Sequence, residues 1–407
     1  MALIVQKFGG TSVGNIDSIR RVAQKISETR QQGYDLVIVV SAMAGETNRL
    51  ISLAESITMQ PDLREYARLL ASGEQAASAL LAIALITQGH AARSYTGEQI
   101  RLRTNGPYDK ARIIGMTADN ILADLQRGVI PIIAGFQGVS AEGEITLLGR
   151  GGSDTTAAAV AAILNADECQ IYTDVDGIYT ADPNLLQEVQ RLNTISSPLL
   201  LEFAHAGAKV VQHRAVAIAH KHQIPLRILS SFDSDTGTQV NTSTTELEQA
   251  IISGISCEQS IARILITNIA KLTDFLTRLL CLLNQSSIEI DMLAVQTNAM
   301  GKHDLNFVLN HDDCANALAI VINLIEKESD AAVRVEEHLA KLSVLGVGVR
   351  SDYSVITTIM QSLQEHIIEV LAVTCSELRI SVIIQANQAA HSVRVLHDVC
   401  GLTAKTL

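Results

Sequence analysis

The fold of this chain is decided by residues 149–183, which read GRGGSDTTAAAVAAILNADECQIYTDVDGIYTADP. The segment starts with a glycine-rich turn, Gly149–Asp154, and continues in an alanine-rich run, residues 155–164, with high helix propensity. A glycine turn that leads into a helix offers backbone N–H groups and the positive end of the helix dipole to an anion. Gln170–Thr173 is then expected as a short strand, and the polar turn Asp174–Gly177 follows it. Two polar loops at the ends of such elements predict one crevice that holds phosphates.

Composition limits the class of protein. A length of 407 residues predicts two or three domains. Hydrophobic residues make up 47%, while aromatic residues make up 3% and tryptophan is absent, so the cores must be aliphatic. Such cores suit parallel α/β layers, whose strands are buried on both faces. The formal net charge of −12 argues against non-specific binding to nucleic acid or to an anionic membrane.

The sequence also indicates a cytoplasmic protein. No apolar run approaches the roughly 20 residues of a membrane helix, and the start MALIVQKFGG lacks the basic region of a signal peptide. The six cysteines form no C-x-x-C pair and are expected as buried free thiols. His220 and His222 lie close together without a third ligand nearby, so we expect no protein metal site.

Strands and helices alternate through the first half of the chain, which predicts a mostly parallel sheet with helices on both faces. The expected strands are residues 2–6, 35–40, 129–136, 170–173 and 225–230. The expected helices are residues 17–29, 64–85 as one helix or two interrupted near 72–74, 155–164, and one that starts at 206–211.

The polar stretch at residues 233–248 has no clear periodicity and marks a domain boundary. Beyond it, a strand–helix–strand–strand–helix pattern occurs twice in succession. An internal repeat of this kind predicts two ferredoxin-like units side by side.

A second glycine turn, Lys7–Ser12, stands at the end of the first expected strand. Its glycines allow a close approach to phosphate, and its lysine can neutralise transferred charge. Alone it is weak evidence, because an ordinary glycine turn with a solvated lysine is as common. It is not a Walker loop, since the chain contains no G-x-x-x-x-G-K-[ST].

Taken together, the motifs are specific. KFGGTSV (7–13), SAMAGET (41–47), SGEQ (72–75), GRGGSD (149–154) and TDVDGIYTADP (173–183) occur in this order. In this set the chain resembles aspartate kinases, members of the amino acid kinase superfamily, and the repeated C-terminal units resemble ACT domains. The resemblance spans the whole chain.

The resemblance implies an α/β fold: an amino acid kinase-type three-layer αβα sandwich with a mostly parallel sheet, plus two ferredoxin-like (ACT) βαββαβ units. The implied domains are residues 1–235 (catalytic), 236–250 (linker), 251–340 (first ACT domain) and 341–407 (second ACT domain, paired with a strand from about 251–258). The implied reaction is phosphorylation of the β-carboxylate of L-aspartate by ATP, with nucleotide-bound Mg²⁺, toward lysine, threonine, methionine and diaminopimelate.

The resemblance also implies a role for each site residue. Lys7 contacts the γ-phosphate, Glu74 pairs with the α-ammonium of aspartate, and Arg150 binds its α-carboxylate. The implied catalytic residues are Lys7 and Asp154. The implied aspartate-binding residues are Ser41, Thr47, Glu74, Arg150, Gly151, Gly152, Ser153 and Asp154. The implied ATP-binding residues are Lys7, Gly9, Gly10, Thr173, Asp174, Tyr179, Asp182, Lys209 and Val210.

Several of these residues have plainer readings. Asp154 is also a candidate cap for a helix starting at Thr155. Glu74 is also consistent with a solvated helix position and Tyr179 with a core position, while Asp176 and Asp182 fit turn residues without ligand contact.

The residue types suit the implied chemistry. The β-carboxyl group of aspartate ordinarily has a pKa near 3.9 and is already ionised at neutral pH, so no general base is needed. Catalysis then depends on positioning and on cations, namely Lys7, Lys209 and Mg²⁺. Two alternatives stay open: another superfamily member such as a glutamate or uridylate kinase, and a catalytically weak regulatory subunit.

The chain departs from the family pattern at three places. Asn184 stands where aspartate kinases usually carry arginine. Lys271–Asp274 replaces a D-x-P-G turn of the first ACT unit, and Asp352–Ser354 replaces an H-P-G turn of the second. Asp274 and Gln296 are the candidate effector residues. A charge reversal in a pocket for a zwitterion changes its specificity, so we expect feedback by lysine or threonine to be lost or altered.

Open sheet edges on the ACT units predict a homodimer or a higher oligomer.

Overall fold

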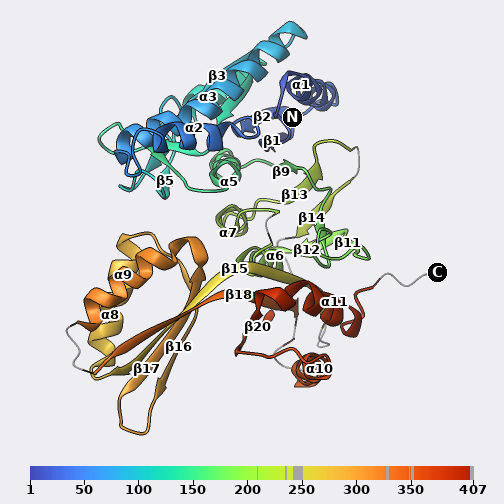
Figure 1. Cartoon of the computed structure of the whole chain (residues 1–407). Coiled ribbons are helices and arrows are strands. Elements are labelled where there is room, and N and C mark those ends of the chain that lie inside the picture. The colour runs from blue at the N-terminus through green and yellow to red at the C-terminus, as the bar shows by residue number, and fades with distance from the viewer. Residues whose placement is uncertain are drawn as a thin grey trace. The chain divides into compact units, whose positions relative to one another are not determined.

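The structure is a computed structural model that describes residues 1–208, 210–233, 236–241, 251–326, 330–347, 349 and 353–403 (Figure 1). The chain divides into two compact units. The first consists of Met1–Ile178, Arg191–His205 and Lys209–Thr245, and the second of Tyr179–Gln190, Ala206–Ala208 and Glu246–Leu407.

The first unit is built on an eight-stranded sheet with the order β12-β14-β13-β9-β1-β2-β6-β3. The described strand pairs are parallel except for β13 with β14. The strands are β1 (Leu3–Phe8), β2 (Asp35–Val40), β3 (Ala92–Tyr95), β6 (Ile130–Ala134), β9 (Glu168–Thr173), β12 (Thr194–Ser196), β13 (Leu226–Ser230) and β14 (Thr238–Asn241).

Helices cover both faces of this sheet (Figure 1). One face packs on α1 (Ile16–Gln31) and α3 (Leu63–Thr87), in a core that joins Ile19 and Leu81 to Ile4 and Leu36 of the strands. The other face packs on α5 (Gly152–Leu164), which contacts β1, β2 and β9 and lies against α7 (His213–Lys221). The layers are therefore helix, sheet and helix.

Smaller elements complete the first unit. They are α2 (Glu46–Glu55), α4 (Asp119–Gln126), α6 (Ser197–His205), a four-stranded sheet of β4 (Arg103–Thr104), β5 (Ile113–Gly115), β7 (Gln137–Val139) and β8 (Ile145–Leu147), and the short strand β11 (Arg191–Leu192), which pairs with β10 (Ile178–Tyr179).

The second unit is built on a six-stranded sheet with the order β16-β17-β15-β18-β20-β19. Two long strands, β15 (Ile251–Ile269) and β18 (Ala332–Val347), pair antiparallel at its centre, so that residues 251–258 lie against 341–347. The other strands are β16 (Ile290–Thr297), β17 (His303–Asn310), β19 (Ala372–Cys375) and β20 (Arg379–Gln385). The helices are α8 (Leu272–Gln285), α9 (Cys314–Ile325), α10 (Tyr353–Glu365) and α11 (Ala389–Val399), with the 3₁₀ turns η1 (His311–Asp313) and η2 (Ala386–Gln388).

Each half of the second sheet has its own apolar core. One contains Phe275 and Phe307, and the other contains Leu342, Ile380 and Leu396. The predicted fold class, a three-layer domain with a mostly parallel sheet plus two ferredoxin-like units, is confirmed.

One open alternative is decided, and two details of the predicted elements are corrected. Residues 64–85 form one helix that is continuous through Gly73, where the absence of a side chain lets α3 approach the Ala42 side chain closely. No helix starts at residues 206–208, since α7 begins at His213 after the cap Gln212. Helix α5 begins inside the glycine turn, at Gly152 rather than Thr155.

Helix α3 also qualifies the statement that no apolar run could span a membrane. Its 25 residues are long and apolar enough by composition, and half of its apolar window is buried in the protein. Its buried side includes Glu74 and Ser78 as well as leucines and alanines, and contributes to the core under the sheet. We therefore describe it as a core helix.

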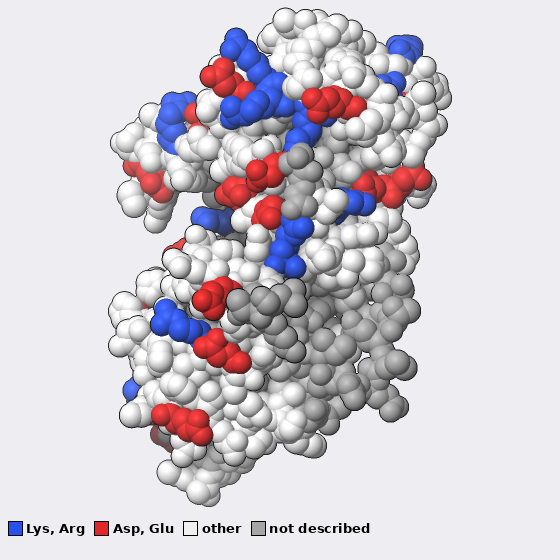
Figure 2. Space-filling view, turned by 90° about the vertical axis from the view of Figure 1, so that its right-hand side faces the viewer, with Lys and Arg blue, Asp and Glu red and all other residues white. Residues whose placement is uncertain are grey.

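Charged side chains of both signs are interspersed on the face shown in Figure 2. Groups of opposite sign adjoin at several places, and neither sign forms a continuous field on that face.

Candidate active site

The candidate site lies where β1 and β2 of the first unit end. The turn after β1 is fixed by the Gly9 N–H, which donates to the Tyr172 carbonyl (3.1 Å), and by the Gly10 carbonyl, which accepts from the Ala44 N–H (3.1 Å). A Cβ on Gly10 would lie 2.9 Å from the Ala42 carbonyl oxygen, so only glycine fits there. The two predicted turns, residues 7–13 and 41–47, are thus joined by backbone contacts.

Lys7 and Asp154 form a buried ion pair at this edge. Side chains alternate along a strand, and Lys7 points to the face that α5 covers. Its Nζ lies 2.7 Å from Asp154 Oδ1, and the two side chains are 11% and 9% exposed. Gly9 leaves room beside the ammonium, since a Cβ there would lie 3.4 Å from Nζ. The pair holds one fixed cation at the mouth of the phosphate turn.

The start of α5 brings the GRGGSD motif to the same place. Gly151 precedes the helix with a φ of +71°, and no side chain caps the helix there. Ser153 packs against Gly135, where a Cβ would lie 2.7 Å from the serine. Asp154 lies in the first helical turn, so its negative charge is stabilised by the helix dipole. The alternative reading of Asp154 as the cap of a helix starting at Thr155 is therefore wrong.

Glu74 on α3 is a buried carboxyl group. It is 4% exposed, and burial raises its pKa to about 7, although hydrogen bonds from backbone groups at Ala42 and at Glu74 itself partly oppose the shift. Its Oε2 accepts no hydrogen bond from the part of the chain that the structure describes. The reading of Glu74 as a solvated helix residue is wrong. A buried carboxyl oxygen without a donor is suited to a cationic ligand group.

The remaining predicted residues of the first unit lie as follows. Ser41 follows β2, and Thr47 lies in the first turn of α2 rather than in a loop. Arg150 is exposed, as a side chain that must reach a ligand would be. Thr173 ends β9, and its hydroxyl donates to the exposed carboxylate of Asp174 (3.1 Å). Val210 is half-buried, and Lys209 lies outside the described residues.

Tyr179 and Asp182 belong to the second unit. Tyr179 is half-buried and Asp182 is exposed. The Asp182 carboxylate accepts from the Asn184 backbone N–H (2.8 Å) and from its side-chain amide (3.0 Å). Asn184, the departure from the family pattern, thus closes a turn on Asp182.

The candidate effector residues lie in the first ferredoxin-like half of the second unit. Asp274 is in the first turn of α8 and pairs with Arg278 (2.7 Å). Gln296 is exposed on β16. Lys271 is the residue that caps α8, without a side-chain hydrogen bond. Asp352 of the second unit's departing turn lies outside the described residues.

Gln212 is a site residue that the sequence analysis missed. Its backbone N–H donates to Asp154 Oδ2 (3.3 Å), and its side chain accepts from the Arg214 N–H (2.5 Å) at the start of α7. A Cβ on Gly151 would lie 2.5 Å from Gln212 Cγ. Glutamine is not a typical helix cap, so no sequence signal pointed to it.

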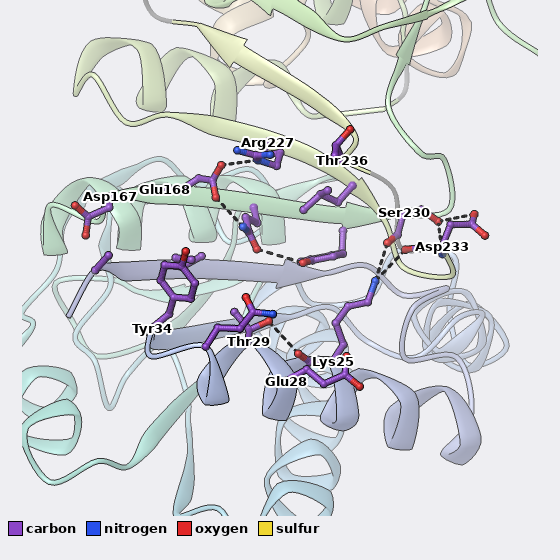
Figure 3. Close-up of a pocket in the computed structure, with 16 residues that line it drawn as sticks. Lys25, Glu28, Thr29, Tyr34, Asp167, Glu168, Arg227, Ser230, Asp233 and Thr236 are labelled. Carbon is purple, nitrogen blue, oxygen red and sulfur yellow. Dashed lines mark hydrogen bonds and ion pairs between the residues drawn. The ribbon is translucent and has the colours of Figure 1, made fainter.

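A pocket of about 570 Å³ lies elsewhere in the first unit, on the sheet face that α1 partly covers. Figure 3 shows Lys25 reaching from α1 to the backbone of Ser230 and Asp233, and Arg227 paired with Glu168 across the strands. Lys7 and Asp154 do not line it. This pocket is therefore separate from the candidate site, which lies where β1 and β2 end.

Comparison with known proteins gives the class. Residues 2–230 match the amino acid kinase family, and residues 342–399 match an ACT domain. The fold and the site thus define an amino acid kinase that carries ACT units.

Full-length relatives narrow this class. The chain is 43% identical over 411 residues to an aspartokinase of Pseudomonas aeruginosa and 42% identical over 405 residues to an aspartate kinase of Stutzerimonas stutzeri. Each match covers 99% of this chain and 98% of the relative. E. coli aspartokinase III, solved with aspartate and ADP, has a TM-score of 0.86 at 23% identity, over 98% of this chain and 99% of its own, which shows a shared fold. The chain belongs to the aspartate kinase family, and the family predicted from its motifs is confirmed.

Proposed function

We propose that this chain transfers the γ-phosphoryl group of ATP to the β-carboxylate of L-aspartate and produces 4-phospho-L-aspartate. The observation that carries the proposal is the Lys7–Asp154 pair (2.7 Å), fixed beside the glycine turn at the end of β1. Relatives from Stutzerimonas stutzeri, Pseudomonas aeruginosa and Bacillus subtilis that match 99% of the chain and are named aspartate kinase or aspartokinase support it.

The chemistry needs no general base. A carboxylate oxygen of aspartate attacks the γ-phosphorus, the bond from that phosphorus to the bridging oxygen breaks, and ADP leaves with the electron pair. The obstacle is repulsion between two anions. Lys7, held in place by Asp154, supplies positive charge where negative charge develops. Gly9 and Gly10 form the turn beside it, in which the Gly9 N–H is already used by the Tyr172 carbonyl.

Aspartate recognition uses opposite charges at a fixed spacing. Glu74 receives the α-ammonium, and Arg150 binds the α-carboxylate with the geometry suited to a guanidinium. Ser41, Thr47 and the turn Gly151–Ser153 line the same edge. Glutamate is rejected because one extra methylene moves its reacting carboxylate away from Lys7.

The nucleotide is bound by residues that follow β9 and by the segment that precedes α7. We assign this role to Thr173, Asp174, Tyr179, Asp182, Lys209 and Val210. Mg²⁺ prefers phosphate and carboxylate oxygens and keeps several waters, so we expect it to arrive on the nucleotide. The exposed Asp174 carboxylate beside the Thr173 hydroxyl is an oxygen donor of the type that fits it. When bound, the ion neutralises charge on the phosphates.

A hydroxamate assay tests the proposal. The purified full chain is incubated with ATP, Mg²⁺ and hydroxylamine, in parallel with L-aspartate, L-glutamate or no amino acid. We expect hydroxamate with aspartate only. Activity with glutamate would favour another superfamily member, and activity with neither would favour a catalytically weak regulatory subunit.

We further propose that the enzyme is cytoplasmic, that it is a homodimer or higher oligomer, and that amino acids reach it at the ACT units. The edge strands β16 and β19 of the second sheet are the places where a second copy would pair. Sedimentation velocity of the full chain checks the oligomer, and a monomer at micromolar concentration would contradict it.

A further inference from the structure

The segment Tyr179–Gln190 carries two of the proposed nucleotide residues, yet it is folded into the second unit. Its anchor is Thr180. The Thr180 N–H donates to the Gln190 carbonyl (2.9 Å), and the Thr180 carbonyl accepts from the Ile255 N–H on β15 (2.7 Å). The Gln190 N–H donates in turn to the Thr180 hydroxyl oxygen (3.1 Å). The loop between Thr180 and Gln190 is thus closed at its base.

Apolar contacts hold the same loop. Ala181 is 3% exposed and belongs to the core that also contains Val393 and Leu396 of α11. Leu185, Leu186 and Val189 pack against this core. The loop is therefore part of the hydrophobic core under α11.

One polar side chain of α11 reaches into this base. His397 is fully buried, and Thr180 is 4% exposed. The His397 Nε2 lies 3.0 Å from the Thr180 hydroxyl oxygen. The other ring nitrogen, Nδ1, is buried without a hydrogen-bond partner among the described residues. Burial lowers the pKa of the imidazole, although Asp398 and Glu188 oppose the shift.

A histidine is a costly choice for this position. A buried ring nitrogen without a partner loses its hydration and gains nothing, whereas a leucine would fill the space with no unpaired polar atom. The contact with Thr180 is what the histidine supplies and a leucine would lack. It fixes the side chain of the residue that lies between Tyr179 and Ala181, one and two positions from the proposed nucleotide residues Tyr179 and Asp182.

We propose that His397 is a positioning residue for the nucleotide loop: through its hydrogen bond to Thr180 it holds Tyr179 and Asp182 in their binding positions, and so sets the affinity for ATP and not for aspartate. The inference rests on the nucleotide role proposed above for Tyr179 and Asp182. It assigns to α11 a part in nucleotide binding. The motifs GRGGSD and TDVDGIYTADP of the first half of the chain give no indication of this part.

The experiment compares His397→Leu, His397→Asn and His397→Gln in the full chain. A glutamine amide reaches the place of Nε2, and an asparagine amide reaches only the place of Nδ1. We expect KM for ATP and Kd for MgADP, measured by calorimetry, to rise about fivefold in the leucine and asparagine variants, as for the loss of one hydrogen bond. KM for aspartate should stay unchanged, and the glutamine variant should behave as the unsubstituted chain.

The matched control is Ser392→Ala. Ser392 is also fully buried on α11, but its hydroxyl donates to the Gln388 carbonyl one turn earlier. It should lose stability without a change in KM for ATP. Thr180→Val, which keeps the shape of the side chain, serves if His397→Leu fails to fold, and it should reproduce the rise in KM for ATP.

Parallel rises in both KM values, an equal effect of Ser392→Ala, or no rescue by glutamine would each overturn the proposal and leave His397 a structural residue. Failure of the unsubstituted chain to phosphorylate aspartate would instead overturn the proposed function. The MgADP titrations would then still test the positioning role.

Discussion

Lys7 is the residue on which the proposed chemistry depends most. It is a buried cation whose partner, Asp154, comes from the first turn of α5. Replacing it by alanine removes the fixed charge opposite the phosphates and leaves Asp154 buried without its partner. We expect Lys7→Ala to lower kcat by about 10²–10³-fold or more.

The measurement is the hydroxamate assay at saturating ATP and aspartate, with circular dichroism to show that the variant folds. Lys25→Ala is a matched control. Lys25 is a half-buried lysine of the same unit that reaches backbone carbonyls in the pocket of Figure 3 and not the site. It should retain turnover, and preserved turnover in Lys7→Ala would refute the role of Lys7.

Glu74 predicts a pH dependence of aspartate binding. Burial raises its pKa to about 7, so below that pH the unliganded site holds a neutral acid that cannot pair with an ammonium group. KM for aspartate should therefore rise as the pH falls from 8 to 6 (about one unit either side of that pKa).

The variant Glu74→Gln should have a high KM at every pH, by about 10–100-fold at pH 8, and a flat profile. Glu46→Gln is the control, because Glu46 is on α2 nearby but is paired with Arg49, which lowers its pKa. A Glu74→Gln variant with the original pH profile would assign the dependence to another group.

The same carboxyl group affects stability. Its pKa is raised on folding, so the folded chain binds more protons than the unfolded chain between pH 4.5 and about 7. The stability that it contributes is complete below pH 4.5 and is lost as the pH rises through about 7, by about 3 kcal/mol at most. Denaturant unfolding of the unliganded chain should show a smaller loss over this range for Glu74→Gln, and an unchanged loss would contradict the assignment.

At the scale of elements, the start of α5 is the feature that places the site. Gly151 has a φ of +71°, and a Cβ there would lie 2.5 Å from Gln212 Cγ. Gly143 has a similar φ of +84°, with nothing within 4 Å of its Cβ position. The two glycines thus share the backbone strain and differ in packing.

Gly143→Ala should cost about 1–2 kcal/mol of stability, the penalty for a left-handed alanine, and leave the kinetics alone. Gly151→Ala should cost more and should also lower kcat/KM for aspartate by about 10²-fold, because it displaces Asp154 and Arg150. Thermal denaturation and the hydroxamate assay measure both effects. Equal kinetics in the two variants would show that the contact with Gln212 has no part in the site.

The elements also show what could be predicted from sequence. Residues 35–40 form the strand expected there, and α1 covers the helix expected at residues 17–29, because hydrophobic periodicity is local. The start of α5 at Gly152 was missed because glycines oppose helix formation by propensity, whereas packing against Phe136 and Leu148 leaves room for nothing larger. Gln212 was missed because its contacts with Asp154 and Gly151 join residues far apart in the chain, which local patterns do not show.

At the scale of the whole molecule, the motif that opened the sequence analysis divides between two units. Residues 149–178 belong to the first unit and residues 179–183 to the second. The sequence shows a continuous motif, and a contiguous catalytic domain of residues 1–235 was the natural expectation. Ala181, Leu185 and Leu186 pack in the core that also contains Val393 and Leu396 of α11. These residues of α11 are more than 200 positions away in the chain, so no local pattern encodes the place of residues 179–190 in the second unit.

The second unit also carries the prediction about feedback. Lys271 stands at the N-terminal end of α8, where the helix dipole disfavours a cation and where its side chain makes no capping bond. Asp274, the remaining acidic candidate, is already paired with Arg278 (2.7 Å). An effector's ammonium group would therefore meet a lysine and a neutralised carboxylate, and we expect the chain to keep most of its activity at millimolar lysine plus threonine.

The variant Lys271→Asp tests two effects of Lys271, one on the stability of α8 and one on effector binding. An aspartate at this position can accept from the free N–H groups of α8, so the variant should be more stable by about 1 kcal/mol in thermal denaturation. It should also gain sensitivity to lysine or threonine if the charge reversal is what removed it. Full inhibition of the unsubstituted chain by the two amino acids would contradict the prediction, because the Lys271 end of α8 would then bind effectors despite its charge.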